Sequence, residues 1–210
     1  AATSANTLSA LSETGSQWRA RGHAVDEIAA DEMARLLGVK HYVGGLVDRR
    51  GGNLHPLNYA LGLAAAAEKA GAKIHGNSRV KDLQSDRDSI TVTTDAGKVT
   101  AGKALICTNA YTGPLANPLG QSVVPVTSVQ VATDPRSDNV AQSILPEGHS
   151  PSDTRRLLVY FRKDAHGRFI MGGRGAMSDK HVLGRQQDLR DVALQLYPQL
   201  GDAIWRNAWC

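Results

Sequence analysis

The stretch GGLVDRRGGNLHPLNYALGLAAAAEKAGAKIHG, residues 44–76, decides the fold class. Pro56 suits the first position of a helix, because the N–H that proline lacks has no partner there. An apolar stripe at helical spacing follows, made of Leu57, Leu61 and Ala64. Gly71 is the natural end of this helix, and residues 73–76 (KIHG) are a short strand candidate. Helix, glycine and strand in this order resemble half of an α/β unit.

Downstream of this unit the pattern changes to short strands. Residues 78–101 contain SRVKDL, SITVTT and KVTA, with a tight turn at 95–97 (DAG), so they predict a three-strand meander. Residues 104–107 (ALIC) are apolar on both faces, which is typical of a strand buried in a parallel sheet. The small polar tip Thr108, Asn109 and Ala110 follows, at the place where open α/β sheets bind ligands.

The residues before residue 44 and after residue 121 predict further elements. Helices are expected over residues 1–20 and 31–37 and around Leu189, Val192 and Leu196, and a weak strand over 40–48. Residues 122–134 predict one long strand, which Pro125 confines to an edge or a bulge. A polar loop (135–154) and a hairpin (156–162 with 168–173) follow. The predicted fold class is α/β plus α+β: part of an α/β domain with the meander, joined to an antiparallel-sheet domain.

Composition excludes several classes of protein. Hydrophobic residues make up 41% of the 210 residues and charged residues 21%, so a packed core is expected. The 24 basic and 20 acidic residues are interspersed, and aromatic residues are only 5%, which argues against a nucleic-acid-binding surface. The longest apolar run, 61–67, is too short to cross a membrane.

Only two cysteines are present. Cys107 is expected to be a small buried hydrophobe, and Cys210 is the last residue, so a disulfide framework is not expected and the chain suits the reducing cytoplasm. The chain starts without methionine and stops at NAWC without a capping feature, so we expect a fragment of a longer protein.

Few short motifs carry chemistry. Neither G-x-G-x-x-G nor G-x-x-x-x-G-K-[ST] occurs, and the glycines of 172–175 are better explained as a turn than as a phosphate cradle. The seven histidines show no H-x-x-x-H spacing, so no metal site is expected, and His55 alone is more simply a helix-start residue than a catalyst. Tyr160 and Arg162 share one side of a strand and could clamp a substrate carboxylate; an exposed ion pair is the simpler alternative.

The ordered set of segments resembles a known family. The pattern Y-x-G-G-x-x-D…G-G-x-L-H-P-L-N-Y…G-L-A-x-A-A…G-A-x-I over residues 42–74 is similar to FAD-dependent oxidoreductases of the D-amino-acid oxidase and glycine oxidase type, nearest the gamma-glutamylputrescine oxidase branch. The meander, ALICTNAY, VVPV and the hairpin ending in GRFIMGGRG follow in family order. The resemblance covers nearly all of residues 25–210.

The resemblance implies a division into two parts. Residues 54–112 would be a partial FAD-binding domain, and residues 1–53 and 113–210 a discontinuous substrate-binding domain. The residues implied near FAD are Val80, Thr108, Asn109, Ala110, Gly52 and His55. Tyr160 and Arg162 would lie in the sheet that roofs the flavin and shapes the substrate pocket.

The implied activity is oxidation of an amine or amino acid by hydride transfer to FAD. Segments that the family carries before residue 1 and after residue 209 are missing, so the fragment alone is expected to be inactive. The family's flavin-side lysine is also missing, so oxidase and dehydrogenase both remain open. A non-catalytic remnant or binding module that cannot hold FAD by itself is the alternative, and an NAD-type reductase is a weaker one.

Overall fold

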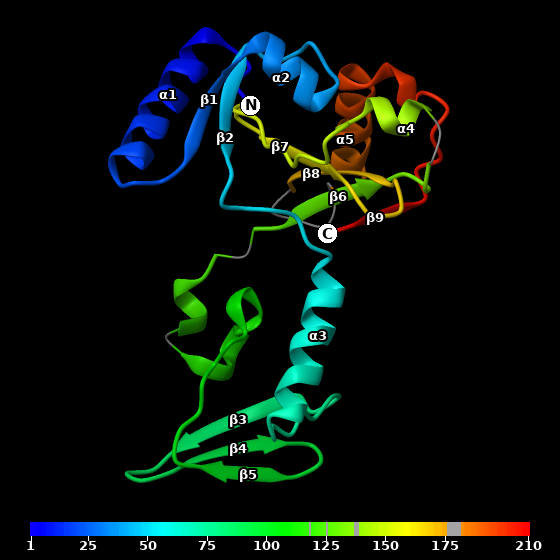
Figure 1. Cartoon of the computed structure of the whole chain (residues 1–210). Helices are drawn as coiled ribbons and strands as arrows, with labels where there is room; N and C mark the ends of the chain where they lie inside the picture. The colour runs from blue at the N-terminus through cyan, green and yellow to red at the C-terminus, as the bar shows by residue number, and fades with distance from the viewer. Residues whose placement is uncertain (118, 125, 137–138, 176–181) are drawn as a thin grey trace. The chain divides into compact units, whose positions relative to one another are not determined.

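The computed structural model consists of two compact units (Figure 1). The structure describes residues 1–117, 119–124, 126–136, 139–175 and 182–210. Unit 1 comprises Ala1–His55 and Val126–Cys210, and unit 2 comprises Pro56–Pro125. Residues 113–125, which the family pattern groups with the substrate-binding part, therefore belong to the second unit.

The N-terminal part of unit 1 is a helix followed by a short β-α-β segment. Its elements are α1 (Ala5–Ala20), β1 (Val25–Ala29), α2 (Ala30–Leu37) and β2 (Gly44–Asp48), and β1 pairs with β2 in antiparallel fashion. Ser4 and Thr7 form a capping box that starts α1. Gly38, with a φ of 73°, ends α2 in the left-handed conformation that glycine adopts without strain. The two helices and the strand predicted here are confirmed.

The larger sheet of unit 1 has four antiparallel strands in the order β7-β8-β6-β9. They are β6 (Ser128–Ala132), β7 (Val159–Lys163), β8 (Phe169–Arg174) and β9 (Asn207–Trp209). The hairpin predicted from residues 156–173 is confirmed as β7 and β8. The predicted 122–134 strand is shorter and lies inside the sheet, not at its edge, because it begins after the proline and keeps every N–H for pairing. Pro125 lies outside the described residues.

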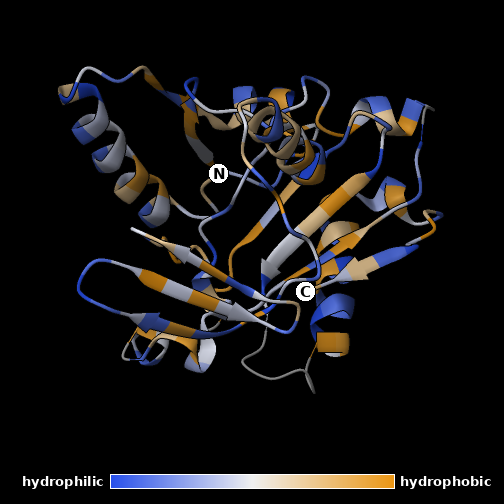
Figure 2. Ribbon diagram, turned by 90° about the horizontal axis from the view of Figure 1, so that it is seen from below, coloured by the Kyte–Doolittle hydropathy of each residue, from blue (hydrophilic) through white to orange (hydrophobic). Residues whose placement is uncertain are grey.

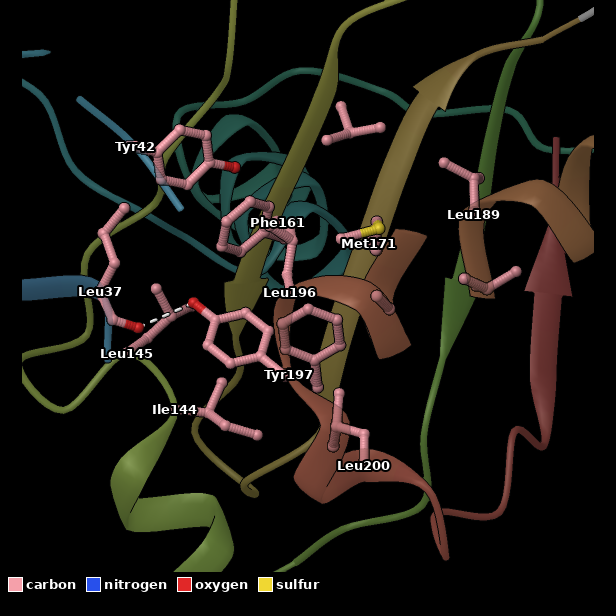
Figure 3. Packing of buried hydrophobic residues seen from close by; sticks show 14 of the residues in the cluster. Leu37, Tyr42, Ile144, Leu145, Phe161, Met171, Leu189, Leu196, Tyr197 and Leu200 are labelled. Carbon is pink, nitrogen blue, oxygen red and sulfur yellow. Dashed lines mark hydrogen bonds between the residues drawn. The ribbon is translucent and has the colours of Figure 1, made fainter. Parts of the chain in front are cut away.

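Helix α5 (Val182–Leu196) packs against β6 and β8 and closes the core of unit 1 (Figure 3). Along β6 the buried Val129 and Val131 alternate with Ser128 and Gln130, which are exposed or partly buried; Figure 2 colours each residue of the ribbon by its hydropathy. In β7, Val159 and Phe161 are buried, whereas the residues that alternate with them, Tyr160 and Arg162, are only partly buried. A short helix, α4 (Asn139–Ser143), interrupts the segment predicted as a polar loop.

Unit 2 contains one long helix and the predicted meander. Its main elements are α3 (Pro56–Lys69), β3 (Val80–Ser85), β4 (Ile90–Thr94) and β5 (Lys98–Ala101), followed by short 3-10 turns at Asn109–Tyr111, Gly113–Ala116 and Leu119–Ser122. The strands pair in the order β3-β4-β5, and Gly97 has a φ of 156° in the turn between the last two. The predicted helix and meander are confirmed.

Two predicted strands of unit 2 are wrong. Residues 73–76 and 104–107 have no strand conformation, Leu105 is 88% exposed, and Cys107 is exposed where a buried residue was expected. A strand buried on both faces needs paired neighbours and covering layers. Every strand ladder among the described residues is antiparallel, and none includes these two segments. Helix α3 likewise has no buried residue.

Within the part of the chain that the structure describes, no helix combines the length and the apolar character needed to cross a bilayer.

Candidate functional site

The four-stranded sheet of unit 1 has one face turned away from the core. We call it the open sheet face. It carries the polar or aromatic side chains of Ser128, Gln130, Tyr160, Arg162 and Trp209, and it also includes Gly172, which has no side chain. Directly opposed residues of neighbouring strands share a face, so the register Tyr160–Gly172–Gln130–Trp209 runs as a row across all four strands. The sheet register therefore gathers side chains that are far apart in sequence.

Tyr160 lies flat against this face. A Cβ atom built on Gly172 would lie 2.3 Å from Cε2 of Tyr160, so the ring occupies the space that a side chain at residue 172 would fill. The phenol oxygen is hydrogen-bonded to Oγ of Ser128 on β6. The contact thus joins the outer strand β7 to β6 across β8.

Arg162 lies two residues further along β7, on the same face as Tyr160. The residue that pairs with it on the neighbouring strand β8 is Ile170, which is 7% exposed. Within the described parts of the chain the Arg162 guanidinium makes no ion pair, so the simpler alternative offered by the sequence is not observed. A partly buried guanidinium without a partner is suited to bind a carboxylate through two parallel hydrogen bonds.

Ser128 and Gly172 were not identified as site residues from the sequence. The alternation of Ser128 and Gln130 with two valines signals that they share a face. Nothing local in the sequence shows that β8 and β6 are neighbours, because helix α4 and strand β7 lie between them in the chain. The pairing of distant strands was therefore the missing information.

A second feature of unit 1 is a cavity of about 450 Å³ beside the glycine loop after β2. Its lining combines apolar and polar residues, which include Ile28, Met33, Leu36, Val47, Gly52, Asn53, Glu147 and Ser150. Gly52, one of the predicted cofactor residues, is therefore part of the cavity wall. His55, the other predicted residue of this loop, is exposed and is not among the lining residues.

Hydrogen bonds hold the segment 147–152 over this cavity. The Asn53 amide donates a 3.2 Å hydrogen bond to the carbonyl oxygen of Gly148 and accepts one from Ser150. Arg35 forms ion pairs with Glu147 and with Glu32. The hydrogen bonds that the Arg35 guanidinium donates to Glu32 and Glu147 raise the pKa of Arg35 above its usual range, which keeps the guanidinium charged.

The predicted residues of unit 2 lie in β3 and in the turn after residue 107. Val80 is partly buried and pairs with Thr94 at the start of β3. Asn109 has a left-handed φ of 46°, and its carbonyl oxygen accepts a 2.7 Å hydrogen bond from the hydroxyl of Thr112. Thr108 Oγ1 lies 2.8 Å from the same hydroxyl. These contacts make residues 108–112 a self-supported turn.

Among the residues that the structure describes, no group of three or more histidine, cysteine, aspartate or glutamate side chains could hold a metal ion.

Comparison with known proteins identifies the family of the chain. The model of the family "FAD dependent oxidoreductase" matches residues 1–210. The chain belongs to the FAD-dependent oxidoreductase family. FAD is the cofactor of that family, and the resemblance found in the sequence is confirmed.

The curated relatives that the chain matches are substantially longer than the chain. It is 36% identical over 182 residues to the probable oxidoreductase OrdL of Haemophilus influenzae, covering 85% of this chain and 41% of the relative. It is 32% identical over 168 residues to gamma-glutamylputrescine oxidoreductase of Escherichia coli, covering 79% and 39%. The chain therefore spans about 40% of the length of these relatives.

Solved structures support the fold. The glycine oxidase of Geobacillus kaustophilus superposes with a TM-score of 0.78 at 20% identity, over 99% of this chain and 56% of that one. NikD, an amino acid oxidase of nikkomycin biosynthesis, gives a TM-score of 0.62 at 20% identity, over 90% and 52%. The predicted mixed α/β fold class, with small antiparallel sheets, is thereby confirmed.

The chain's own residues fit the FAD cofactor only in part. The open sheet face offers a partly buried tyrosine ring and a guanidinium that makes no ion pair among the described residues, which are groups that can pack against or hydrogen-bond to a flavin ring. The dinucleotide end is different, because residues 104–107 are exposed and irregular and the sequence has no glycine-rich phosphate cradle. The described residues thus fit the ring end and do not form the phosphate site.

Proposed function

We propose that this chain is the substrate-binding part, with a portion of the FAD-binding part, of an enzyme that oxidises an amine or an amino acid. The observation that carries the proposal is the presence of Tyr160 and Arg162 on one open sheet face, with no ion pair to the guanidinium among the described residues. Family membership and the names of the relatives, an oxidoreductase of gamma-glutamylputrescine and a glycine oxidase, support an amine or amino-acid substrate.

The chemistry follows from the kinds of side chain on the open sheet face. FAD, when bound, accepts a hydride from the carbon that carries the amine. Arg162 would bind a substrate carboxylate through two hydrogen bonds, and the hydroxyl of Tyr160 would donate or accept one more. Together the two side chains would orient the substrate C–H bond and keep water away from it, which is the main contribution of the protein to such a reaction.

The cofactor contacts are proposed from the family pattern. In a longer protein that contains this chain, Val80, Thr108, Asn109 and Ala110 would contact the nucleotide part of FAD, and Gly52 and His55 the ring part. The exposed apolar residues of segments 73–76 and 104–107 would pair with additional strands there, since their backbone groups lack strand partners in the described chain. We also propose that residues 54–112 are the partial FAD-binding domain and that the protein is located in the cytoplasm.

The test uses the product of the complete gene. We expect a yellow protein with flavin absorbance, which is bleached by a carboxylate-bearing amine. Arg162→Met should raise KM for such a substrate about 100-fold or more, because a charged hydrogen-bond pair is lost. Arg87→Met, at an exposed bend between β3 and β4, is the matched control and should change nothing. A colourless protein that takes up no FAD would contradict the proposal.

One observation favours the alternative, a binding module or remnant without chemistry. Helix α3 has no buried residue and segment 104–107 forms no strand, so the described residues of unit 2 do not form a nucleotide site by themselves. Replacing Thr108 and Asn109 with alanine in the complete protein distinguishes the two hypotheses. Weaker FAD retention supports the enzyme, and unchanged retention supports the alternative.

A further inference from the structure

We propose that Ser128 is a positioning residue, which holds the phenol of Tyr160 flat on the open sheet face, and that Gly172 provides the space for the ring. The inference rests on the proposed function and extends it, since it identifies what orients one of the two side chains assigned to substrate binding. Neither Ser128 nor Gly172 would need to touch substrate or FAD in this role.

The sheet register shows how the three residues meet. Tyr160 on β7 lies opposite Gly172 on β8, and Gly172 lies opposite Gln130 on β6. Ser128 is two residues before Gln130 and therefore on the same face. The tyrosine ring thus extends diagonally over β8, and its hydroxyl reaches the Ser128 hydroxyl on the next strand.

Gly172 is necessary for this placement for steric reasons. A Cβ atom there would lie 2.3 Å from Cε2, 2.7 Å from Cζ and 2.9 Å from the hydroxyl oxygen of Tyr160. Contacts this short are not possible, so any side chain at residue 172 would lift the ring away from the sheet. The absence of a side chain therefore determines where the phenol can lie.

The hydrogen bond then determines how the phenol is presented. A tyrosine hydroxyl has one proton and lone pairs to accept with, so the bond to Ser128 leaves hydrogen-bonding capacity for a ligand. Arg162 follows two residues later on the same side, roughly 7 Å along the strand. A phenol held still at that distance from a guanidinium can bind a second polar group of the same small substrate, whereas a mobile phenol would lose part of that binding to side-chain entropy.

The closing experiment is a double-mutant cycle in the complete protein. Ser128→Ala should lower kcat/KM about 2- to 10-fold, which corresponds to the loss of one net hydrogen bond. The same substitution in a Tyr160→Phe background should have no effect, since Ser128 acts only through the phenol. Ser128→Thr keeps the hydroxyl and should restore the wild-type value. An equal loss in both backgrounds would overturn the proposal.

A second readout does not depend on catalysis. With 3-fluorotyrosine incorporated at residue 160, the fluorine resonance should shift or broaden in Ser128→Ala and return in Ser128→Thr. Gly172→Ala should displace the resonance too, whereas Gly184→Ala, where a Cβ meets nothing within 4 Å, is the control. An unchanged resonance in Ser128→Ala overturns the positioning role even in an active enzyme. A protein that shows the expected resonance changes but oxidises no amine contradicts only the proposed function.

Discussion

The hydroxyl of Tyr197 donates a 2.7 Å hydrogen bond to the carbonyl oxygen of Leu37, 160 residues earlier in the chain (Figure 3). Leu37 is the last residue of α2, where helix carbonyls lack an intrahelical partner. The same carbonyl accepts a 3.2 Å hydrogen bond from the N–H of Leu145. Tyr197 is completely buried just after α5, so this bond fastens the C-terminal end of α2 to the core of unit 1.

Tyr197→Phe removes this bond and leaves the ring packing unchanged. We expect the free energy of unfolding of the complete protein to fall by about 1–2 kcal/mol, measured by urea denaturation. Burial raises the pKa of the Tyr197 phenol above its ordinary value of 10.0, so this loss should be the same at pH 6 and pH 9. Tyr111→Phe, at a side chain that is 94% exposed, should have no effect. Equal stability of the two variants would contradict the role given to the bond.

Gly38 ends α2 under two constraints that can be separated by experiment. Its φ is 73°, and a Cβ atom there would lie 2.0 Å from the carbonyl oxygen of Ser143. Gly22 has a similar φ of 80° but nothing within 4 Å. Gly22→Ala should therefore lower the free energy of unfolding by about 1 kcal/mol through backbone strain alone, and the melting temperature should fall accordingly. Gly38→Ala should lower it clearly more, and an equal effect would show that the Ser143 contact is not tight.

Asp153 is a buried carboxylate that organises the start of β7. Its side chain is completely buried, pairs with Arg155 and accepts a 3.2 Å hydrogen bond from the N–H of Val159. Asp153→Ala leaves both donors without this partner, so we expect a loss of about 2–4 kcal/mol in the free energy of unfolding. Asp95→Ala breaks an exposed pair with Lys81 and should change the same quantity by less than about 1 kcal/mol. Calorimetry of the two variants tests the difference.

Asp164, in the turn of the β7–β8 hairpin, should make stability depend on pH. Burial opposes its ionisation, but hydrogen bonds from the backbone and guanidinium of Arg168 and from the N–H of His166 outweigh burial and hold its pKa below the ordinary 3.8. A lowered folded-state pKa means that the contribution is complete above pH 3.8 and is lost as pH falls through the folded value.

The measurement is urea unfolding at pH 7 and at pH 3. Asp164→Asn should reduce the stability difference between the two pH values, because the amide does not titrate. Asp95→Asn, at an exposed carboxylate, should leave that difference nearly as it is in the wild type. If Asp164→Asn loses as much stability on acidification as the wild type, the hairpin carboxylate is not responsible.

Local patterns predicted the elements that are stabilised by their own residues. Helix α3 follows from Pro56, its apolar spacing and Gly71, and the meander follows from alternation and the turn at Gly97. The strand predicted at residues 104–107 was wrong because an apolar run becomes a strand only beside partners, and the described chain offers none there. The same segment is expected to be a strand in a longer protein that supplies those partners.

The amino-acid sequence by itself determined the order of helices and hairpins and the side of β7 that carries Tyr160 and Arg162. It also determined the resemblance to FAD-dependent oxidoreductases. All of these depend on residue spacing and local conformation. Only the tertiary structure decided that Ser128 and Gly172 lie against Tyr160. It also decided which carbonyl Tyr197 binds. Contacts of that kind depend on which strands and helices pack together, and the burial of the whole core selects that packing over the alternatives that local patterns allow.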